Sequence, residues 1–164
     1  MLKKLFLEYP RLTLGVAESL TGGQVQARIV AIPGASEFFL GGITAYALAQ
    51  KQRHLGVDRA TAQAVNGVSA EVARQMARGA CALFGADLGI ATTGYAEAAP
   101  EFGAPAPCVY WAICHLLPDN SGNLRDGFLG FQGLSRVDVQ EAAAAALCRE
   151  LAAYLSAWRS RARG

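Results

Sequence analysis

The stretch VAESLTGGQVQ, residues 16–26, sets a carboxylate, two hydroxyls and two glycines directly after an apolar run. On a sharp strand-to-helix turn, the hydroxyl of Ser19 would be exposed, with backbone N–H groups nearby to stabilise an oxyanion. Such an arrangement suits a nucleophile of acyl transfer. In a structural interpretation of the same residues, Ser19 or Thr21 caps the helix, Glu18 offsets its positive end and the glycines relax the turn. Spacing alone leaves both interpretations open.

A serine nucleophile needs a base, and Lys51 is the candidate because neither His54 nor His115 has a suggestive position. A lysine amine that is desolvated beside a pocket becomes neutral near physiological pH and can accept a hydroxyl proton. The alternative for Lys51 is a solvated lysine that begins a helix. Tyr46, five residues earlier, either orients the amine or fills core space.

Three further positions carry polar groups or glycines that could meet a ligand. Thr93 and Gly94, at a predicted strand end, either donate to a substrate or are a buried threonine and a turn glycine. Arg136, in the first turn of the last predicted helix, is unfavourable for the helix dipole, which suggests an anionic ligand or simply an exposed arginine. Gly42, in a Gly-Gly pair, would weaken its strand unless a backbone or ligand approaches closely.

The elements that must position these residues alternate between strand and helix patterns. We predict strands at 12–18, 39–48, 86–94, 108–117 and 124–133, helices within 22–32, from Thr61, at 66–85 and from Ser135 to Trp158, a loop at 95–107 and a hairpin turn at 118–123. In the helix at 66–85, Ser69 is the predicted N-cap, Gly85 the stop, and Val72, Met76, Ala80 and Leu83 the buried face. This alternation predicts a layered α/β fold, and the late hairpin makes its sheet mixed and partly antiparallel.

In open α/β sheets, ligands collect at the carboxyl ends of strands, where helix N-termini offer free N–H groups. Segments 17–23, 46–51 and 92–96 follow predicted strands and hold the polar residues described above. We therefore expect these three segments to form one site.

Composition restricts the class of protein. The 164 residues are 52% hydrophobic and 17% charged, which fits one domain spanning 1–164 and leaves surface for a homodimer or higher homo-oligomer. A net charge of +2 disfavours a nucleic-acid partner. The four cysteines lack a C-x-x-C spacing, so no metal site is expected. With no apolar window near the roughly 20 residues of a spanning helix, we expect no membrane association and a cytoplasmic protein.

Taken together, the motifs resemble a known family. They are AESLTGG (17–23), PGASEFFLGGITAY (33–46) with Lys51, LGV (55–57), NGVS (66–69) and TTG (92–94). Their order and spacing resemble the C-terminal domain of CinA proteins and the stand-alone PncC nicotinamide-nucleotide amidohydrolases. The resemblance implies a three-layer α/β/α sandwich and hydrolysis of the carboxamide of nicotinamide mononucleotide, giving nicotinate mononucleotide and ammonia in pyridine-nucleotide salvage.

The resemblance also implies roles for residues. Ser19 would be the nucleophile, with Lys51 and Tyr46 as its activating partners. The residues implied to bind the nucleotide substrate are Glu18, Thr21, Gly22, Gly23, Gly42, Thr93, Gly94 and Arg136, the last as a phosphate-binding arginine. The reaction requires no metal and no redox cofactor.

The sequence departs from the family pattern in three places around this site. The loop after Thr93-Gly94 carries Glu97, Ala98 and Ala99 where the family has glycines, Ala47 and Leu48 replace polar residues, and the segment before Arg136 lacks its acid. The leading hypothesis is therefore a nicotinamide-nucleotide amidase with a Ser-Lys site. The alternative is a catalytically inactive paralogue that binds a nucleotide or a partner protein.

Overall fold

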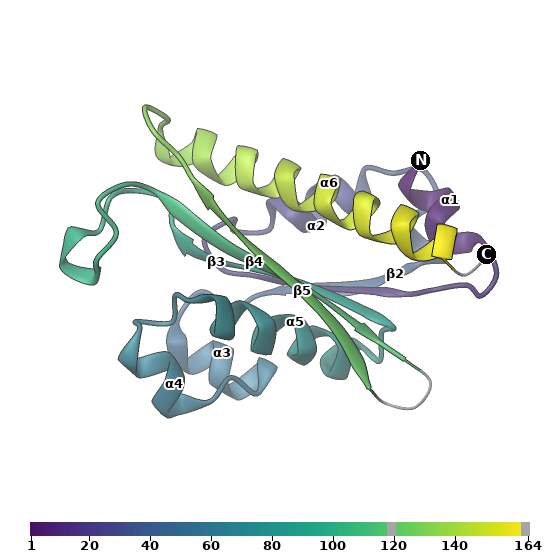
Figure 1. The fold of residues 1–164 in the computed structure, drawn as a ribbon, viewed down its shortest axis with the longest axis horizontal. Coiled ribbons are helices and arrows are strands. Elements are labelled where there is room, and N and C mark those ends of the chain that lie inside the picture. Colours follow the sequence, from purple (N-terminus) through teal and green to yellow (C-terminus); the bar gives the residue numbers. More distant parts are fainter. Residues whose placement is uncertain (118–120, 162–164) are drawn as a thin grey trace.

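The computed structural model describes residues 1–117 and 121–161, and its five strands form one sheet in the order β2-β1-β3-β4-β5 (Figure 1). The strands are β1 (Leu14–Glu18), β2 (Phe39–Thr44), β3 (Leu88–Tyr95), β4 (Cys108–Leu116) and β5 (Gly122–Gly130). β1 pairs in parallel with β2 and β3, whereas β4 is antiparallel to both β3 and β5. The predicted mixed sheet is confirmed.

Helices cover both faces of the sheet. The helices are α1 (Leu2–Leu7), α2 (Gln24–Val30), α3 (Leu48–Leu55), α4 (Arg59–Ala64), α5 (Ala70–Phe84) and α6 (Arg136–Arg161), with short 3₁₀ turns η1 (Ala35–Glu37) and η2 (Pro100–Phe102). Figure 1 shows α1, α2 and α6 on one side of the sheet and α3, α4 and α5 on the other. This arrangement confirms the α/β/α sandwich. No helix among the described residues is long and apolar enough to cross a membrane.

The two faces of the sheet differ in the size of their side chains. Toward α2 and α6, the core contains large residues, namely Leu14, Val16, Leu88, Ile90, Ile113, Leu147 and Leu151. Toward α5 it contains small ones, including Ala17, Ala91 and Ala112. A Cβ added to Gly89 would lie 1.9 Å from the carbonyl oxygen of Ala77 in α5. Helix α5 therefore rests almost directly on the backbone of β3.

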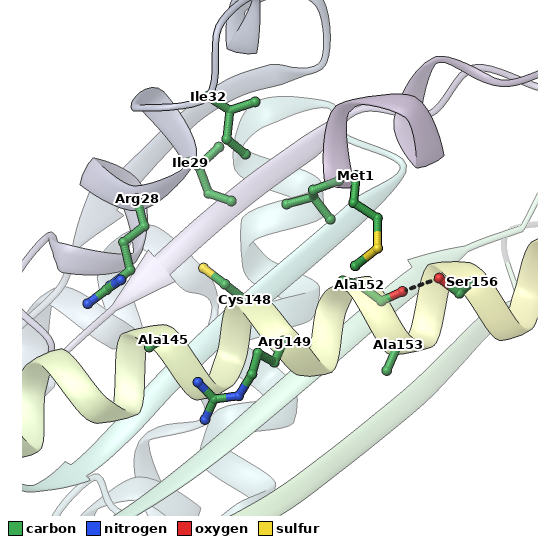
Figure 2. A pocket seen from close by; sticks show the side chains of 11 residues that line it. Met1, Arg28, Ile29, Ile32, Ala145, Cys148, Arg149, Ala152, Ala153 and Ser156 are labelled. Carbon is green, nitrogen blue, oxygen red and sulfur yellow. Dashed lines mark hydrogen bonds between the residues drawn. The ribbon is translucent and has the colours of Figure 1, made fainter.

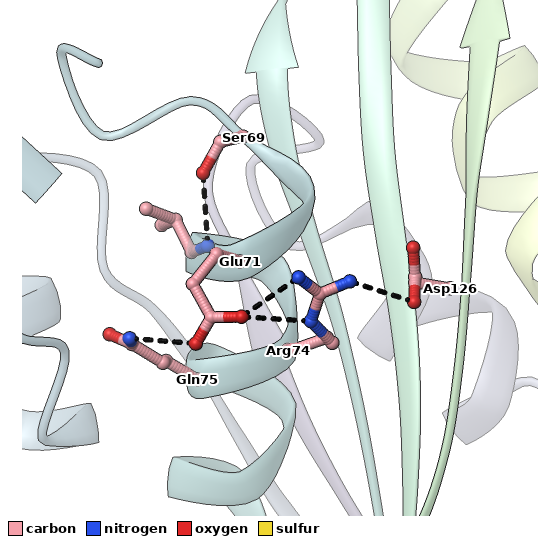
Figure 3. Close-up of polar contacts among 6 residues, drawn as sticks. Ser69, Glu71, Arg74, Gln75 and Asp126 are labelled. Carbon is pink, nitrogen blue, oxygen red and sulfur yellow. Dashed lines mark hydrogen bonds and ion pairs between the residues drawn. The ribbon is translucent and has the colours of Figure 1, made fainter. Parts of the chain in front are cut away.

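Helix α5 is fixed at its start and tied to β5. The Oγ of Ser69 accepts a hydrogen bond from the N–H of Val72 at 3.1 Å, as an N-cap. Arg74 binds Glu71 at 2.8 Å and Asp126 of β5 at 3.1 Å (Figure 3). The predicted cap at Ser69 is confirmed, and so is the stop at Gly85, which has φ 63°. Leu83 was predicted to be buried, which is wrong, because it is 44% exposed.

The second strand is shorter than predicted. It ends at Thr44 rather than at residue 48, and Leu48 already belongs to α3. The N–H of Ala45 still bonds to the carbonyl of Glu18, after which the chain turns away from the sheet. The sequence gives no signal for this turn, because residues 45–47 include neither glycine nor proline. Part of the predicted turn at 118–123 lies outside the described residues.

Substituting Gly89 with alanine tests the close contact of α5 with β3. We expect Gly89→Ala to reduce the free energy of unfolding by about 3 kcal/mol, because the added methyl group meets backbone that must shift. Thermal and urea unfolding followed by circular dichroism measure the loss. Gly130→Ala in β5 is the control, since its Cβ would meet only a Phe128 ring atom at 3.6 Å. Equal effects of the two substitutions would contradict the explanation.

Candidate functional site

The carboxyl ends of β1, β2 and β3 lie at one edge of the sheet, because these three strands run parallel. Segments 17–23, 46–51 and 92–96 each follow or end one of these strands, so the fold brings them to the same edge, as predicted.

Glu18 is fully buried at the end of β1 and caps α2. Its Oε2 accepts hydrogen bonds from the N–H groups of Gly23 and Val25 at 3.0 Å, and its Oε1 accepts one from Gln26 at 2.9 Å. These are donors that an α-helix leaves unpaired in its first turn, and a carboxylate satisfies them well. Glu18 therefore has the structural role considered above. The expectation of free N–H groups at the start of this helix is wrong for these three donors.

Ser19 follows on the turn that Glu18 fixes, and it does not cap the helix. The turn relies on Gly22 and Gly23, which have φ of 61° and 104°. Ser19 is 5% exposed, and its hydroxyl has no hydrogen-bond partner among the described residues. Ser19 lies one residue beyond the end of β1, between Glu18, which contacts the start of α2, and Leu20, which packs in a cluster with Val139 and Ala143 of α6. Its hydroxyl is therefore not engaged by the turn and is available to a ligand.

Lys51 is buried on α3, with 4% of its surface exposed. Its Nζ donates to the backbone carbonyl of Tyr46 at 3.2 Å. Burial lowers the pKa of the amine from 10.5 to about 8, because a charged ammonium loses solvation there. The alternative of a solvated lysine is therefore wrong, and the amine has the desolvated surroundings that a base requires.

Thr93 and Lys51 meet at Gly67, in the turn before α5. The hydroxyl of Thr93 donates to the carbonyl of Gly67 at 2.6 Å. A Cβ on Gly67 would lie 3.5 Å from the Nζ of Lys51. The turn at Gly67, which sequence reasoning used only as a motif, therefore closes this side of the candidate site. An Asn-Gly pair is the signal that could have identified it.

Thr21 and Thr92 form a buried pair on the other side of the sheet edge. Their hydroxyl oxygens are 2.8 Å apart, and both residues are fully buried. Thr21 was predicted to contact substrate, but its hydroxyl binds Thr92 and so links the turn after β1 to β3. Thr92 was not singled out from the sequence.

Two of the predicted glycines have packing explanations. A Cβ on Gly42 would lie 2.4 Å from the side chain of Gln26, and one on Gly94 would lie 2.2 Å from the carbonyl of Cys108. The close approach expected at Gly42 is thus made by a side chain of α2, and Gly94 permits the pairing of β3 with β4.

Tyr46 lies at the surface beside the candidate site rather than in the core. It is 57% exposed, so the core-filling alternative is wrong. Its hydroxyl accepts a hydrogen bond from Nη2 of Arg136 at 2.8 Å, while Nη1 of Arg136 binds Oε2 of Glu97 at 2.7 Å. Arg136 is exposed, as one alternative held, but a carboxylate from the divergent loop already occupies it. This role of Glu97 was not predicted.

Among the cavities of the described residues, two of more than 550 Å³ are relevant to a ligand. One, of about 580 Å³, lies under the loop at 95–107 and is lined by the aromatic side chains of Tyr95, Phe102, Tyr110, Phe128 and Phe131, with Val68 beside Gly67. The other, of about 640 Å³, lies between α2 and α6, where Arg28 and Arg149 flank Ile29 and Cys148 (Figure 2). None of the predicted site residues lines either cavity. Among the described residues, no three His, Cys, Asp or Glu side chains are grouped to hold a metal.

A double-mutant cycle tests the threonine pair. We expect Thr21→Val to reduce the free energy of unfolding by about 1–2 kcal/mol, because it leaves the buried hydroxyl of Thr92 without this partner. The double variant Thr21→Val/Thr92→Val should lose less than the sum of the two single variants. Urea unfolding measures all three. Strict additivity would contradict the pairing.

The buried amine of Lys51 makes stability depend on pH. Between pH 8 and 10.5 the unfolded state binds more protons than the folded state, so the stability of the wild type should rise across this interval. Lys51→Met lacks the buried charge. We expect it to be more stable than the wild type below pH 8, by an amount on the order of 2 kcal/mol, with the difference shrinking toward pH 10.

Thermal unfolding across pH 6 to 10 measures this difference. Lys4→Met is the matched control, because the side chain of Lys4 is 82% exposed. A Lys51→Met advantage that stays constant with pH would show that the amine is not shifted.

Comparison with known proteins identifies the family. A family model described as the CinA C-terminal domain matches residues 3–155. The CinA-like protein of Chlorobaculum tepidum is 43% identical over 114 residues, which are 68% of this chain and 26% of that protein. The CinA-like protein of Chlorobium limicola is 38% identical over 145 residues, 88% of this chain and 34% of that protein. The chain thus spans about a quarter to a third of these relatives.

Solved structures agree with this. The CinA superfamily protein from Klebsiella pneumoniae 700603 has a TM-score of 0.85 and 26% identity, covering 96% of this chain and 94% of that one. A competence or damage-inducible protein from Enterobacter asburiae has a TM-score of 0.77 and 30% identity, covering 93% and 95%. This chain belongs to the CinA family, whose C-terminal domain it carries over nearly its whole length.

Proposed function

We propose that this protein is an amidohydrolase that converts a nicotinamide nucleotide, with nicotinamide mononucleotide as the reference substrate, to the corresponding nicotinate and ammonia. The observation that carries the proposal is the buried amine of Lys51, whose pKa is about 8, at the same edge of the sheet as the turn that carries Ser19. The resemblance of the motifs to the PncC amidohydrolases supplies the substrate.

The reaction begins when Oγ of Ser19 attacks the carboxamide carbon and its proton passes to neutral Lys51. At pH 7, one unit below a pKa of about 8, roughly a tenth of the Lys51 amines are neutral. The protonated amine then donates to the departing nitrogen, so that ammonia leaves rather than an amide ion. Water then attacks the acyl-enzyme and gives a proton to Lys51, which passes it to the departing Oγ of Ser19, so that nicotinate is released and both residues return to their starting state.

The oxyanion of the tetrahedral intermediate needs N–H donors near Ser19. Along the turn, the N–H of Gly22 binds the carbonyl of Ser19, and those of Gly23, Val25 and Gln26 bind Glu18. We therefore assign the oxyanion to the N–H groups of Leu20 and Thr21, which precede these engaged donors. Glu18 serves the reaction indirectly, because it holds the turn on which those donors lie.

Ammonia release from nicotinamide mononucleotide tests the proposal. We expect steady turnover by the wild type, and a loss of at least about 10³-fold in kcat for Ser19→Ala and for Lys51→Met, because each removes one half of the nucleophile–base pair. A coupled ammonia assay measures the rates. With Lys51 as base, kcat/KM should rise with pH through about 8 and then level off.

Ser156→Ala and Lys4→Met are the matched controls. Both residues lie away from the sheet edge, on α6 and α1, and both variants should keep wild-type rates. If Ser19→Ala released ammonia as fast as the wild type, the serine mechanism would be excluded.

The second candidate is an inactive paralogue that binds a nucleotide or a partner protein. The ion pair of Arg136 with Glu97 favours it, because the loop carboxylate occupies the cation that binds the Tyr46 hydroxyl. Calorimetry that finds nucleotide binding without ammonia release would support this candidate. The homo-oligomeric state expected from composition stays a prediction.

A further inference from the structure

The loop at 95–107 places a negative charge at the surface beside the candidate site. Glu97 lies two residues after β3, and its carboxylate binds Arg136, the first residue of α6, at 2.7 Å. The same guanidinium donates a hydrogen bond to the hydroxyl of Tyr46. The backbone carbonyl of Tyr46 in turn accepts a hydrogen bond from the amine of Lys51. A continuous set of contacts therefore runs from Glu97 to the proposed base.

We propose that Glu97 is a specificity-determining residue, which makes the site select a nucleoside carboxamide without a phosphate over its phosphorylated form. The inference rests on the proposed amidase activity and revises its preferred substrate from the nucleotide to the nucleoside, with the mononucleotide as the poorer substrate. The guanidinium of Arg136, beside Tyr46, is the group that would bind a phosphate here, since arginine binds phosphate through paired N–H donors. Here one of its terminal nitrogens is engaged by a carboxylate and the other by a phenol.

A phosphate that approached Arg136 would meet two obstacles. It would have to displace Glu97, and it would then lie beside a carboxylate of the same sign. The first obstacle is small, because Glu97 and Arg136 have side chains 67% and 44% exposed, and such surface pairs are weak. The second persists while Glu97 remains nearby, since like charges brought together at a binding surface exclude the wrong partner. A ligand that ends in a ribose hydroxyl avoids both.

The loop holds Glu97 near Arg136 through its own contacts. Ala99 and Ala104 exchange backbone hydrogen bonds at 2.7 and 3.1 Å, which close the loop into a short bridge. The rings of Tyr95 and Phe102 stack with centroids 5.8 Å apart. The hydroxyl of Tyr95 also accepts a hydrogen bond from Asn66, beside the turn that contacts Lys51. The acid is thus carried by a structured loop that is anchored to the site.

Substitution of Glu97 by its neutral isostere tests the proposal. Ammonia release from nicotinamide riboside and from nicotinamide mononucleotide would be compared in the purified protein. For the wild type, we expect kcat/KM to be about tenfold higher for the riboside. In Glu97→Gln, kcat/KM for the mononucleotide should rise about fivefold to tenfold, while that for the riboside changes less than twofold.

Two further variants separate the role of Glu97 from a general effect of charge. Glu101→Gln removes an exposed acid from η2 in the same loop, and should leave the ratio of the two substrates unchanged. Adding Arg136→Gln to Glu97→Gln should abolish the gain for the mononucleotide, because the gain depends on the freed guanidinium. A gain that survives this second substitution would overturn the proposal.

Calorimetry of both ligands distinguishes failure of this inference from failure of the proposed function. If neither ligand is hydrolysed, the proposed activity is wrong, but the ratio of the two dissociation constants in the wild type and Glu97→Gln still tests the preference. The specificity role of Glu97 is refuted if ammonia is released and the wild type prefers the mononucleotide. It is also refuted if Glu97→Gln changes the ratio of kcat/KM values, or the ratio of dissociation constants, for the two ligands by less than twofold.

Discussion

The burial of one amine, that of Lys51, is the physical constraint on which the proposed chemistry depends. Water stabilises the charged form of a lysine, so a lysine enclosed by α3 and the turn at Gly67 binds its proton less tightly. The enclosure depends on the sheet beneath it, where small residues and Gly89 let α5 approach closely enough to fix that turn. The same enclosure that suits Lys51 to the proposed role of base is expected to reduce the stability of the fold at neutral pH. Active sites often retain such conflicts, because function needs them.

Glu18 is a second buried ionisable residue, and unlike Lys51 it has several backbone hydrogen-bond partners. The carboxylate of Glu18 is enclosed as completely as Lys51, yet three backbone donors compensate for its lost hydration. It therefore acts as structure, holding the turn between β1 and α2, while the hydroxyl of Ser19 beside it remains without a partner among the described residues. The contrast between a carboxylate with three donors and a hydroxyl without a protein partner in the described part of the chain motivates the different roles proposed for Glu18 and Ser19.

Much of the fold could be predicted because it depends on local patterns. The cap at Ser69, the stop at Gly85 and the alternation of strand and helix are signals within a few residues, and the structure confirms them. The position of segments 17–23, 46–51 and 92–96 at one edge could be predicted because strands that run in parallel end at the same edge of a sheet. The exposure of Leu83 and the end of β2 at Thr44 could not be predicted in this way, because the packing of distant elements decides them.

Residue types in the sequence suggested a candidate site, but the contacts of those residues could not be predicted. Sequence patterns indicated Glu18, Thr21, Thr93 and Arg136, yet the partners of the last three, namely Thr92, Gly67 and Glu97, come from other elements. That Lys51 is enclosed rather than solvated also depends on residues remote in the chain. Such pairings are tertiary contacts between elements that are distant in the sequence, so periodicity and spacing cannot predict them.

The reversal of strand direction between β3 and β4 has a consequence for how such a protein can diversify. Because β4 returns beside β3, the connection between them is a hairpin that projects beyond the sheet at the same edge as the candidate site (Figure 1). Its exposed positions, such as Glu97 and Phe102, can change without loss of a strand pair, whereas its buried alanines, Ala96, Ala99 and Ala104, are held by packing. We infer that variation at the exposed positions would alter which molecules reach the candidate site while the sheet beneath it stays the same.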